Sequence, residues 1–312
     1  MLHFSYDEDR LIFTVQTKYE MYREIMGQLA GKVAVITGAS RGLGLAIAQT
    51  YAREGAAVVI GARNSRQIEQ VVADLRASGA QAAGRSCDVG DLMQVRALAD
   101  LAVETFGKID IWVNNAGLSN AYGPTSSIPV QRFEAVINTN VLGTYYGSMV
   151  ALEHMLPRKS GKLINLLGRG DDGPVKYQNA YASSKIWIRS FTLALAQEHK
   201  RDGVGIYAFN PGLVDTDMLR QLEAVEGYEK KLKPLSTVIR WWANDADVPA
   251  NKALWLASSA TDGKTGLVVK VLTTRKVIGG LLNDVTRRIT RQPGRDATLS
   301  IKSIPAALRA EP

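Results

Sequence analysis

Short apolar runs recur along the chain, separated by longer stretches whose apolar residues have helical spacing. The runs predict strands at residues 33–36, 58–60, 81–87, 109–113, 161–167 and 204–209. The stretches predict a helix that begins at residue 43 and helices over residues 68–77, 92–106, 133–156 and 180–200. Most of the runs lack polar alternation, which is typical of strands buried on both faces. Strands that alternate with helices indicate a parallel sheet covered by helices on both faces.

Three glycines lie at the turn between the first predicted strand and the first predicted helix. Gly38 would permit the turn, Gly42 would let a phosphate approach the backbone, and Gly44 would let the helix pack closely on the strand. The N–H groups of the first helical turn would then face the pyrophosphate of a dinucleotide. Because a strand precedes this turn and another follows the helix, the pattern favours a dinucleotide site over a turn without a ligand.

Together these patterns predict an α/β fold with a Rossmann-type, doubly wound parallel sheet. A single domain is expected over residues 31–269, preceded by an N-terminal arm at 1–30 and followed by a basic C-terminal extension at 270–312. Within the arm, a strand is expected at residues 11–15 and a helix at residues 18–29.

Composition narrows the class of protein. The 312 residues are 46% hydrophobic and 22% charged, which allows a large buried core. The single cysteine, Cys87, excludes an internal disulfide and a cysteine-based zinc cluster, and the three histidines lack ligand spacing, so no metal site is expected. No apolar run approaches the roughly 20 residues of a membrane span, and the N-terminus lacks a signal-peptide pattern. A cytoplasmic location is therefore expected.

Most of the net charge of +8 lies in the basic extension. Interleaved aromatic residues and recognition motifs are missing there, so no nucleic-acid partner is expected. Leu281, Leu282, Val285 and Ile289 predict an apolar helical stripe with arginines near its end. Such a helix would suit a neighbouring subunit or peripheral contact with an anionic membrane, but cations near a helix C-terminus are also simply favourable. The last twenty residues are expected to be loose.

Tyr181 and Lys185 lie four residues apart, on one face of a predicted helix. An ammonium beside a phenol lowers the pKa of the phenol, and the tyrosine can then exchange a proton with a carbonyl or alcohol oxygen. The same spacing also occurs in ordinary surface helices. Other polar motifs follow predicted strands, where ligands bind in a parallel sheet.

These motifs resemble the short-chain dehydrogenase/reductase (SDR) family, classical type, over roughly residues 31–269. The motifs are Thr37-Gly-Ala-Ser-Arg-Gly-Leu-Gly44, Asp88, Asn114-Asn-Ala-Gly117, Asn140, Tyr181-x-x-x-Lys185 and Pro211-Gly-Leu-Val-Asp-Thr216. The resemblance implies an oxidoreductase that interconverts a carbonyl and an alcohol on a small-molecule substrate by hydride transfer. It also implies a homodimer or homotetramer and a final strand that begins at Thr265.

The resemblance also implies individual roles. Tyr181 would be the general acid/base, Lys185 would lower its pKa and hold the nicotinamide ribose, and Asn140 would anchor a proton-relaying water. The expected cofactor-binding residues are Gly38, Ser40, Arg41, Gly42, Leu43, Gly44, Arg63, Asp88, Val89, Asn115, Ala116, Gly117, Tyr181, Lys185, Pro211, Gly212, Val214 and Thr216.

The end of the second predicted strand favours NADP(H). Enzymes that use NAD place an acid there to bind the ribose 2′-hydroxyl, whereas this chain has Ala62 followed by Arg63. Arg41 lies inside the glycine loop. Two guanidiniums without a nearby carboxylate suit a 2′-phosphate, although either arginine could be a solvated surface charge.

One family residue is missing. The family usually has a serine thirteen residues before the tyrosine, where it hydrogen-bonds the substrate oxygen; here that position is Gly168. Losing such a donor typically costs on the order of 10²–10³ in rate. Arg169, Ser119, Asn120 or an ordered water would substitute for the serine, or the glycine would make room for a large or polarised substrate.

A third interpretation is that ordinary dehydrogenase activity is lost. The chain would then be an NADP(H)-binding regulatory or scaffold protein, or a non-redox lyase or isomerase. The neighbouring Asp171 and Asp172 are interpreted as solvated turn residues rather than as a functional acid pair.

Residues 217–248 are expected to form a lid over the substrate. Apolar residues mixed with charges predict amphipathic lid helices and favour a bulky hydrophobic carbonyl or alcohol. Gly168, Arg169 and Trp241 are the candidate substrate contacts. An equally supported interpretation is that Trp241 and Trp242 only pack the lid on the core.

Overall fold

Seven parallel strands form the central sheet of the computed structural model, which describes residues 27–272 and 297–307. In sheet order they are β3 (Ala82–Ser86), β2 (Ala57–Ala62), β1 (Val33–Thr37), β4 (Ile111–Asn114), β5 (Gly161–Leu166), β6 (Val204–Asn210) and β8 (Leu267–Lys270). The chain runs outward from β1 in one direction and from β4 in the other, which leaves a crevice where the order reverses. The predicted doubly wound α/β fold is confirmed.

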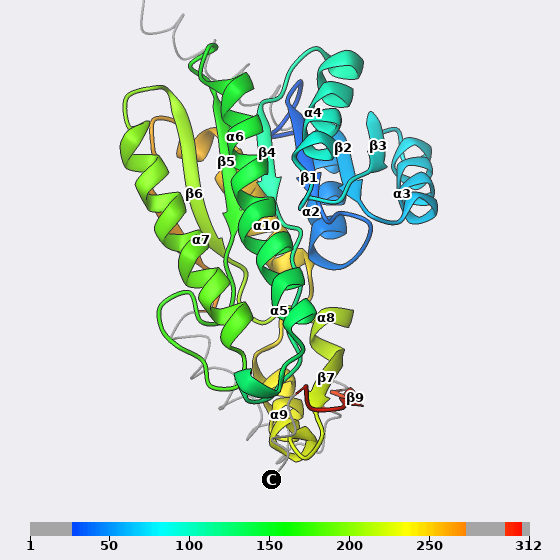
Figure 1. Ribbon diagram of the computed structural model, residues 1–312. Coiled ribbons are helices and arrows are strands. Elements are labelled where there is room, and N and C mark those ends of the chain that lie inside the picture. The colour runs from blue at the N-terminus through cyan, green and yellow to red at the C-terminus, as the bar shows by residue number, and fades with distance from the viewer. Residues whose placement is uncertain (1–26, 273–296, 308–312) are drawn as a thin grey trace, which may run out of the picture.

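Helices cover both faces of this sheet (Figure 1). The helices around the sheet are α2 (Gly42–Arg53), α3 (Ser65–Ala77), α4 (Leu92–Phe106), α6 (Gly143–Met155), α7 (Asn179–Glu198) and α10 (Asp247–Ala257). Strand β1 shows how the two faces are separated: Ala34 and Ile36 join the core beneath α2, α3 and α10, whereas Val33 and Val35 join the core beneath α4, α6 and α7. This alternation is the two-residue period of a strand buried on both sides.

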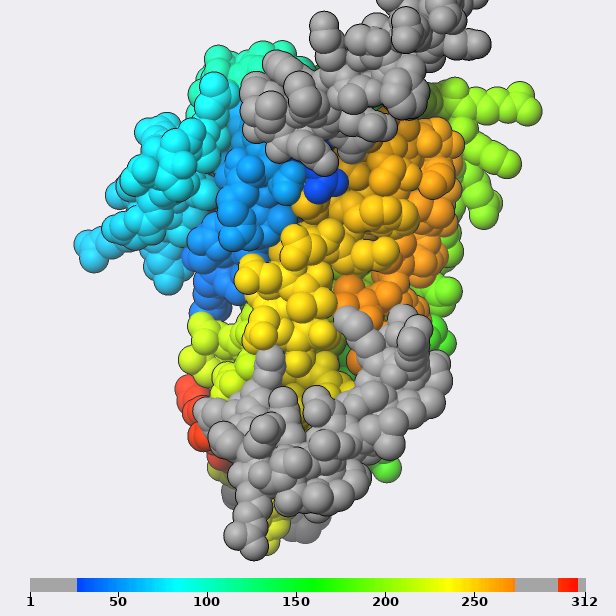
Figure 2. Space-filling model, turned by 180° about the vertical axis from the view of Figure 1, so that it is seen from behind, coloured from blue at the N-terminus to red at the C-terminus, as the bar shows by residue number. Residues whose placement is uncertain are grey.

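Helices α2 and α10 lie together on one face, as Figure 2 shows in blue and yellow. The fully buried Tyr51 joins them, because its hydroxyl donates a 2.9 Å hydrogen bond to the carbonyl of Ala253. Helix α4 has the predicted bounds. The side chain of Asp91 accepts hydrogen bonds from its first turn, and Gly107, with φ of 82°, ends it in the left-handed region.

The long helix predicted at residues 133–156 is instead three pieces. Helix α5 (Val130–Val136) continues into a π-helical segment, η2 (Ile137–Leu142), and then into α6. A π-helical turn widens the backbone spiral and is often found at functional sites. Here it contains Asn140.

The lid also differs from the prediction. After a short α8 (Asp217–Arg220), the chain forms strand β7 (Gln221–Val225), followed by η3 (Glu229–Leu232) and α9 (Leu235–Trp242). Strand β7 pairs in parallel with β9 (Ser300–Ile304), from Gln221 opposite Ser300 to Val225 opposite Ile304. The lid is therefore not purely helical, and the prediction that the last twenty residues are loose is wrong for β9.

Two smaller segments complete the structure: α5 is preceded by a turn, η1 (Thr125–Ser127), and α10 is followed by a turn, η4 (Ser259–Thr261). Among the described residues, no helix is long and apolar enough to cross a membrane. The predicted strand at 11–15, most of the predicted helix at 18–29 and the basic stripe at 281–289 lie outside the described residues.

Candidate active site

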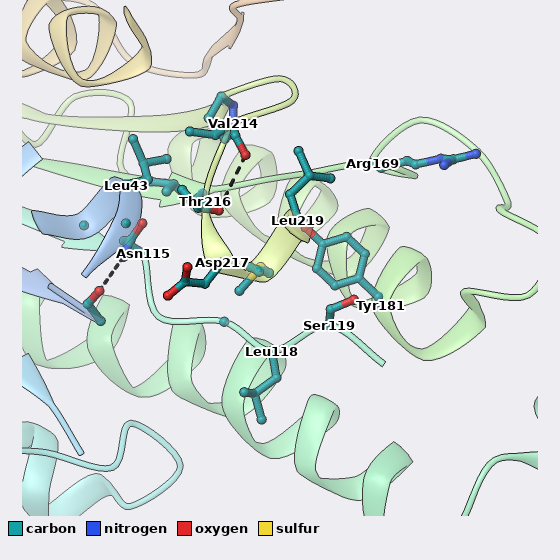
Figure 3. A pocket seen from close by; sticks show the side chains of 18 of the residues that line it. Leu43, Asn115, Leu118, Ser119, Arg169, Tyr181, Val214, Thr216, Asp217 and Leu219 are labelled. Atoms are coloured by element: carbon teal, nitrogen blue, oxygen red, sulfur yellow. Dashed lines mark hydrogen bonds between the residues drawn. The ribbon is translucent and has the colours of Figure 1, made fainter. Parts of the chain in front are cut away.

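A cleft of about 1270 Å³ lies beyond the carboxyl ends of the sheet strands (Figure 3). Every residue that the sequence assigns to the cofactor lines this cleft, and so do Gly168 and Arg169. Asn140 is fully buried and does not line the cleft. Trp242 lines the cleft, whereas Trp241, the predicted substrate contact, does not.

Close packing explains two of the loop glycines. Gly38 has a φ of 66°, and a Cβ there would lie 2.8 Å from the Cα of Ala116. A Cβ on Gly44 would lie 2.4 Å from both the carbonyl oxygen of Gly38 and the side-chain nitrogen of Asn115. Since real Cβ atoms do not approach so closely, only glycine fits at either position without a shift in the loop.

Asn115 and Thr37 fix the glycine loop to the end of β4. The Asn115 amide donates hydrogen bonds of 2.9 and 3.1 Å to the carbonyls of Thr37 and Gly38. The Thr37 hydroxyl accepts from the backbone N–H groups of Asn115 and Ala116, each at 3.1 Å. The sequence identified Asn115 only as a cofactor-binding residue and missed the Thr37 hydroxyl. Thr37 stands directly before Gly38, the first glycine of the loop, and that position is the sequence signal that could have identified it.

The N-terminus of α2 faces the cleft without a side-chain cap. Arg41, the residue before the helix, makes no capping hydrogen bond, and the first turn holds no acid. The first N–H groups of a helix attract anions. Gly42, with φ of 59°, lines the space in front of them, where a Cβ would meet only the Thr216 side chain, at 3.4 Å. This cradle fits the pyrophosphate of a dinucleotide.

The two arginines expected at the 2′-phosphate have different surroundings. Arg63 is exposed at the end of β2 and forms no ion pair within residues 27–272 and 297–307. Arg41 lies 3.5 Å from the carboxylate of Asp217, so the prediction that neither arginine has a nearby carboxylate is wrong for Arg41. Asp217 belongs to the lid, and the sequence alone does not show that the lid lies beside the glycine loop. With side chains 68% and 56% exposed, this pair is weak and readily exchanged.

Asp88 and Val89, which the family resemblance implies as contacts for the adenine, follow β3 and line the cleft. Asp88 accepts a 2.9 Å hydrogen bond from the N–H of Gly90, and Val89 is buried beside it. Cys87 also lines the cleft, but burial raises the pKa of its thiol to about 12. The thiol is therefore protonated at neutral pH and is a poor nucleophile.

Helix α7 brings Tyr181 and Lys185 into the cleft together. The ammonium of Lys185 lies 5.5 Å from the centroid of the Tyr181 ring and donates a 3.0 Å hydrogen bond to the carbonyl of Leu166. Burial lowers the pKa of Lys185 to about 8. Burial, and then the negative charge of Asp171, raise the pKa of Tyr181 to about 12, so the predicted lowering is not observed. Tyr181 is therefore protonated at neutral pH and can donate a proton.

Asn140 connects the π-helical segment to two neighbours. Its side-chain oxygen accepts a 2.8 Å hydrogen bond from the N–H of Leu118, and its amide donates to the carbonyl of Leu118 and to the Ser184 hydroxyl, both at 3.0 Å. The side chain is fully buried. Asn140 thus fixes the loop after β4 against α7, while its implied role as a water anchor stays a prediction.

Gly168 lies directly against the phenol of Tyr181. A Cβ on Gly168 would lie 2.3 Å from the Tyr181 hydroxyl oxygen. The phenol therefore fills the space that a side chain at position 168 would need. Within the part of the chain that the structure describes, the hydroxyl makes no hydrogen bond.

The proposed replacements for the missing serine differ in placement. Figure 3 shows Ser119 beside the Tyr181 ring and Arg169 extending away from it. The Ser119 hydroxyl is exposed and makes only a 3.4 Å contact with the carbonyl of Asn120. The Asn120 side chain already accepts from the Tyr181 N–H and donates to the carbonyl of Ala121. Ser119 is therefore the best placed alternative donor.

Asp171 and Asp172 have opposite environments. Asp171 is only 4% exposed; it accepts a 3.0 Å hydrogen bond from the Asn210 amide and lies 3.5 Å from the ammonium of Lys270. Asp172 is exposed and pairs with the same ammonium at 2.7 Å. The solvated-turn interpretation is therefore wrong for Asp171. The loop folds back on α7, so closely that a Cβ on Gly170 would lie 2.6 Å from an atom of that helix.

The lid lines the cleft with apolar side chains. These are Met218, Leu219, Leu222, Leu232, Pro234, Leu235, Val238 and Trp242. Trp241 packs edge-to-face on Trp242, and its indole nitrogen is buried without a hydrogen-bond partner. Across the described residues, no three histidine, cysteine or acidic side chains gather in a way that could hold a metal.

Comparison with known proteins agrees with this geometry. A family model described as short chain dehydrogenase matches residues 32–227. A putative ketoacyl reductase of granaticin polyketide synthase from Streptomyces violaceoruber is 37% identical over 63% of this chain and 72% of its own length. The 3beta-hydroxysteroid dehydrogenase 1 of Eggerthella lenta is 34% identical over 81% of this chain and 94% of its own length.

Solved structures give the same result. A variant of actinorhodin polyketide ketoreductase with NADPH has a TM-score of 0.69 and 29% identity, over 77% of this chain and 95% of its own. The 3-ketoacyl-(acyl-carrier-protein) reductase from Brucella melitensis, complexed with NADH, has a TM-score of 0.71 and 28% identity. The match covers 80% of this chain and 99% of the reductase. With its sheet, its glycine loop and its Tyr181–Lys185 pair at one cleft, the chain belongs to the short-chain dehydrogenases, a family of oxidoreductases.

Proposed function

We propose that this protein is an NADP(H)-dependent oxidoreductase that interconverts a carbonyl and an alcohol on a bulky hydrophobic substrate. One observation carries the proposal: Tyr181 and Lys185 line the same cleft as the uncapped N-terminus of α2. The nicotinamide cofactor would supply or accept the hydride. The glycine loop would hold its pyrophosphate, and the residues that follow β3 and β4 would hold its adenosine and nicotinamide halves.

The choice of NADP(H) rests on the 2′-phosphate end of the cleft. Arg63 follows β2 where an NAD enzyme has an acid, and the exposed pair of Arg41 with Asp217 can give way to a phosphate. Solved relatives hold NADPH or NADP, and one holds NADH. Arg63→Ala is expected to raise the KM for NADPH about tenfold or more with little effect on NADH, because only the phosphate contact is lost. Steady-state kinetics with both cofactors test this.

The proton chemistry falls to Tyr181. With a pKa of about 12 it holds its proton at neutral pH and would give it to the carbonyl oxygen during reduction. The Ser119 hydroxyl would donate a second hydrogen bond to that oxygen. Lys185, with a pKa of about 8, is partly neutral in mild base and would exchange the proton with solvent.

The apolar lid supports a bulky hydrophobic substrate. The names of two relatives, a ketoacyl reductase and a hydroxysteroid dehydrogenase, agree with large substrates. A second candidate is an NADP(H)-binding protein without redox turnover. It is favoured by Gly168, which has no side chain that could donate a hydrogen bond to the substrate oxygen.

NADPH consumption by the purified protein, measured with a panel of bulky ketones, aldehydes and quinones, separates the two candidates. Turnover that Tyr181→Phe abolishes is the expected result. Tight NADPH binding without turnover on any compound would favour the second candidate.

A further inference from the structure

Three tyrosines from separate parts of the chain meet at the lid end of the cleft. The ring of Tyr177 lies 5.3 Å from that of Tyr122 and 5.2 Å from that of Tyr228, between centroids. Tyr122 lies in the loop after β4, Tyr177 precedes α7 and Tyr228 belongs to the lid. Tyr122 also lines the cleft. The three rings therefore connect the lid to the two loops beside the acid–base pair.

Two lysines lie over these rings. The ammonium of Lys176 is 5.0 Å from the centroid of Tyr177, and that of Lys231 is 5.2 Å from the same centroid and 5.6 Å from that of Tyr228. Aromatic faces attract cations, so both ammoniums are held beside one ring. Both side chains carry positive charge at this rim, and an anionic group that reached them would gain favourable charge interactions.

Three carboxylates that line the cleft have an arginine partner, although the exposed pair of Asp217 with Arg41 is weak. The pairs are Asp215 with Arg220, Asp217 with Arg41, and Glu223 with Arg132. By contrast, neither Lys176 nor Lys231 forms an ion pair with any residue that the structure describes. Lys231 lines the cleft directly. The lid end therefore combines apolar walls with positive charge that has no ion-pair partner among residues 27–272 and 297–307.

We infer that the rim formed by Lys176, Lys231 and the three tyrosines binds an anionic oxygen group, a carboxylate or a phosphate, at the far end of the substrate. The inference rests on the proposed function and extends it. The substrate class is then a ketone or alcohol with an apolar body and an anionic tail. The body lies along the lid, and the tail binds the two ammoniums by charge-assisted hydrogen bonds.

Three phenyl ketones of equal length test this inference: benzoylbutyrate, its methyl ester, and the matching phosphate monoester. For the wild type, at least one anionic ketone is expected to have a KM about tenfold below that of the ester, the effect of two exposed charge contacts. Comparison of the two anions shows which group the rim prefers. Lys176→Gln and Lys231→Gln should each remove much of this advantage, and each should raise the KM of the ester far less than that of the anionic ketone.

Lys230→Gln is the matched control, because Lys230 belongs to the same short helical turn as Lys231 but neither lines the cleft nor lies over one of the three rings. Equal KM values for all three ketones would overturn the inference. An equal effect of Lys230→Gln and Lys231→Gln would also overturn it, because it would indicate a diffuse charge effect. So would a KM that rises as much for the ester as for the anionic ketone, because the lysines would then only hold the lid.

A protein that reduces none of the three ketones would count against the proposed reductase, not against the rim. In that case, calorimetric titration of benzoylbutyrate into the NADPH complex tests whether the rim binds the anionic group. Binding that Lys231→Gln weakens and Lys230→Gln does not would support the rim. Absent binding, or binding unaffected by Lys231→Gln, would overturn it.

Discussion

At the scale of single residues, the Tyr181 hydroxyl occupies the space that a side chain at position 168 would need. A Cβ on Gly168 would lie 2.3 Å from that hydroxyl oxygen. Restoring serine therefore displaces the general acid as well as adding a donor.

Gly168→Ser is expected to lower kcat, by up to about 10²-fold, because a displacement of the phenol near 1 Å misaligns the proton donor. Gly168→Ala carries the same Cβ without the hydroxyl and should lose a similar amount. Steady-state reduction of one ketone by both variants gives the comparison. A large gain in the serine variant alone would show that the missing donor, and not the position of the phenol, limits the reaction.

Asp171 is the second residue whose effect can be isolated. Its buried carboxylate helps to raise the pKa of Tyr181, although burial is the larger cause. Alcohol oxidation needs the phenolate, so its rate rises as the pH approaches the pKa of Tyr181. Asp171→Asn removes a negative charge and should lower that pKa, which shifts the rise in kcat/KM to lower pH.

Asp172→Asn is the control for this shift, since Asp172 is exposed and shares Lys270 with Asp171. It should leave the pH profile in place. A profile that moves equally in both variants, or in neither, would contradict the assigned effect of Asp171.

At the scale of elements, local patterns predicted most of the sheet and its helices. The runs at 33–36, 58–60 and 204–209 are the cores of β1, β2 and β6, and the helix at 92–106 matches α4. The features that the sequence did not predict are mostly contacts between segments far apart in the chain. The pairing of β7 with β9 and the contact of Arg41 with Asp217 depend on how distant segments meet, and the apolar spacing in 133–156 carries no mark of a π-helical turn.

The β7–β9 pair gives an element-scale prediction. Ile304 is 4% exposed and packs with Ala121, Ile128 and Val225 in a small cluster separate from the two large cores. Ile304→Asp buries a charge and should open this sheet without unfolding the central one. The KM for a bulky ketone is expected to rise about tenfold, with little change in the Kd for NADPH.

Ser300→Asp places the same charge at an exposed position on the same strand and should change neither constant. If Ile304→Asp weakened NADPH binding as much as ketone binding, the small sheet would be part of the cofactor site rather than of the lid.

At the scale of the whole molecule, the two large cores hold the sheet and the cofactor half of the cleft, whereas the lid and β9 share a much smaller core. Local unfolding takes the least free energy where few apolar contacts are lost. Hydrogen exchange followed by mass spectrometry should therefore show residues 221–232 and 300–304 exchanging together and faster than β1, β4 and β5. Protection of the lid equal to that of the central strands would contradict this division.

The parallel pairing of β7 with β9 also has a consequence for the order of events during synthesis. The seven strands of the central sheet have all been translated once Lys270 is added, but the partner of β7 appears only with residues 300–304. A nascent chain can thus complete its nucleotide cradle while its substrate wall still lacks a strand. During synthesis, the proposed cofactor half of the cleft can therefore form before the proposed substrate half is closed by its last strand.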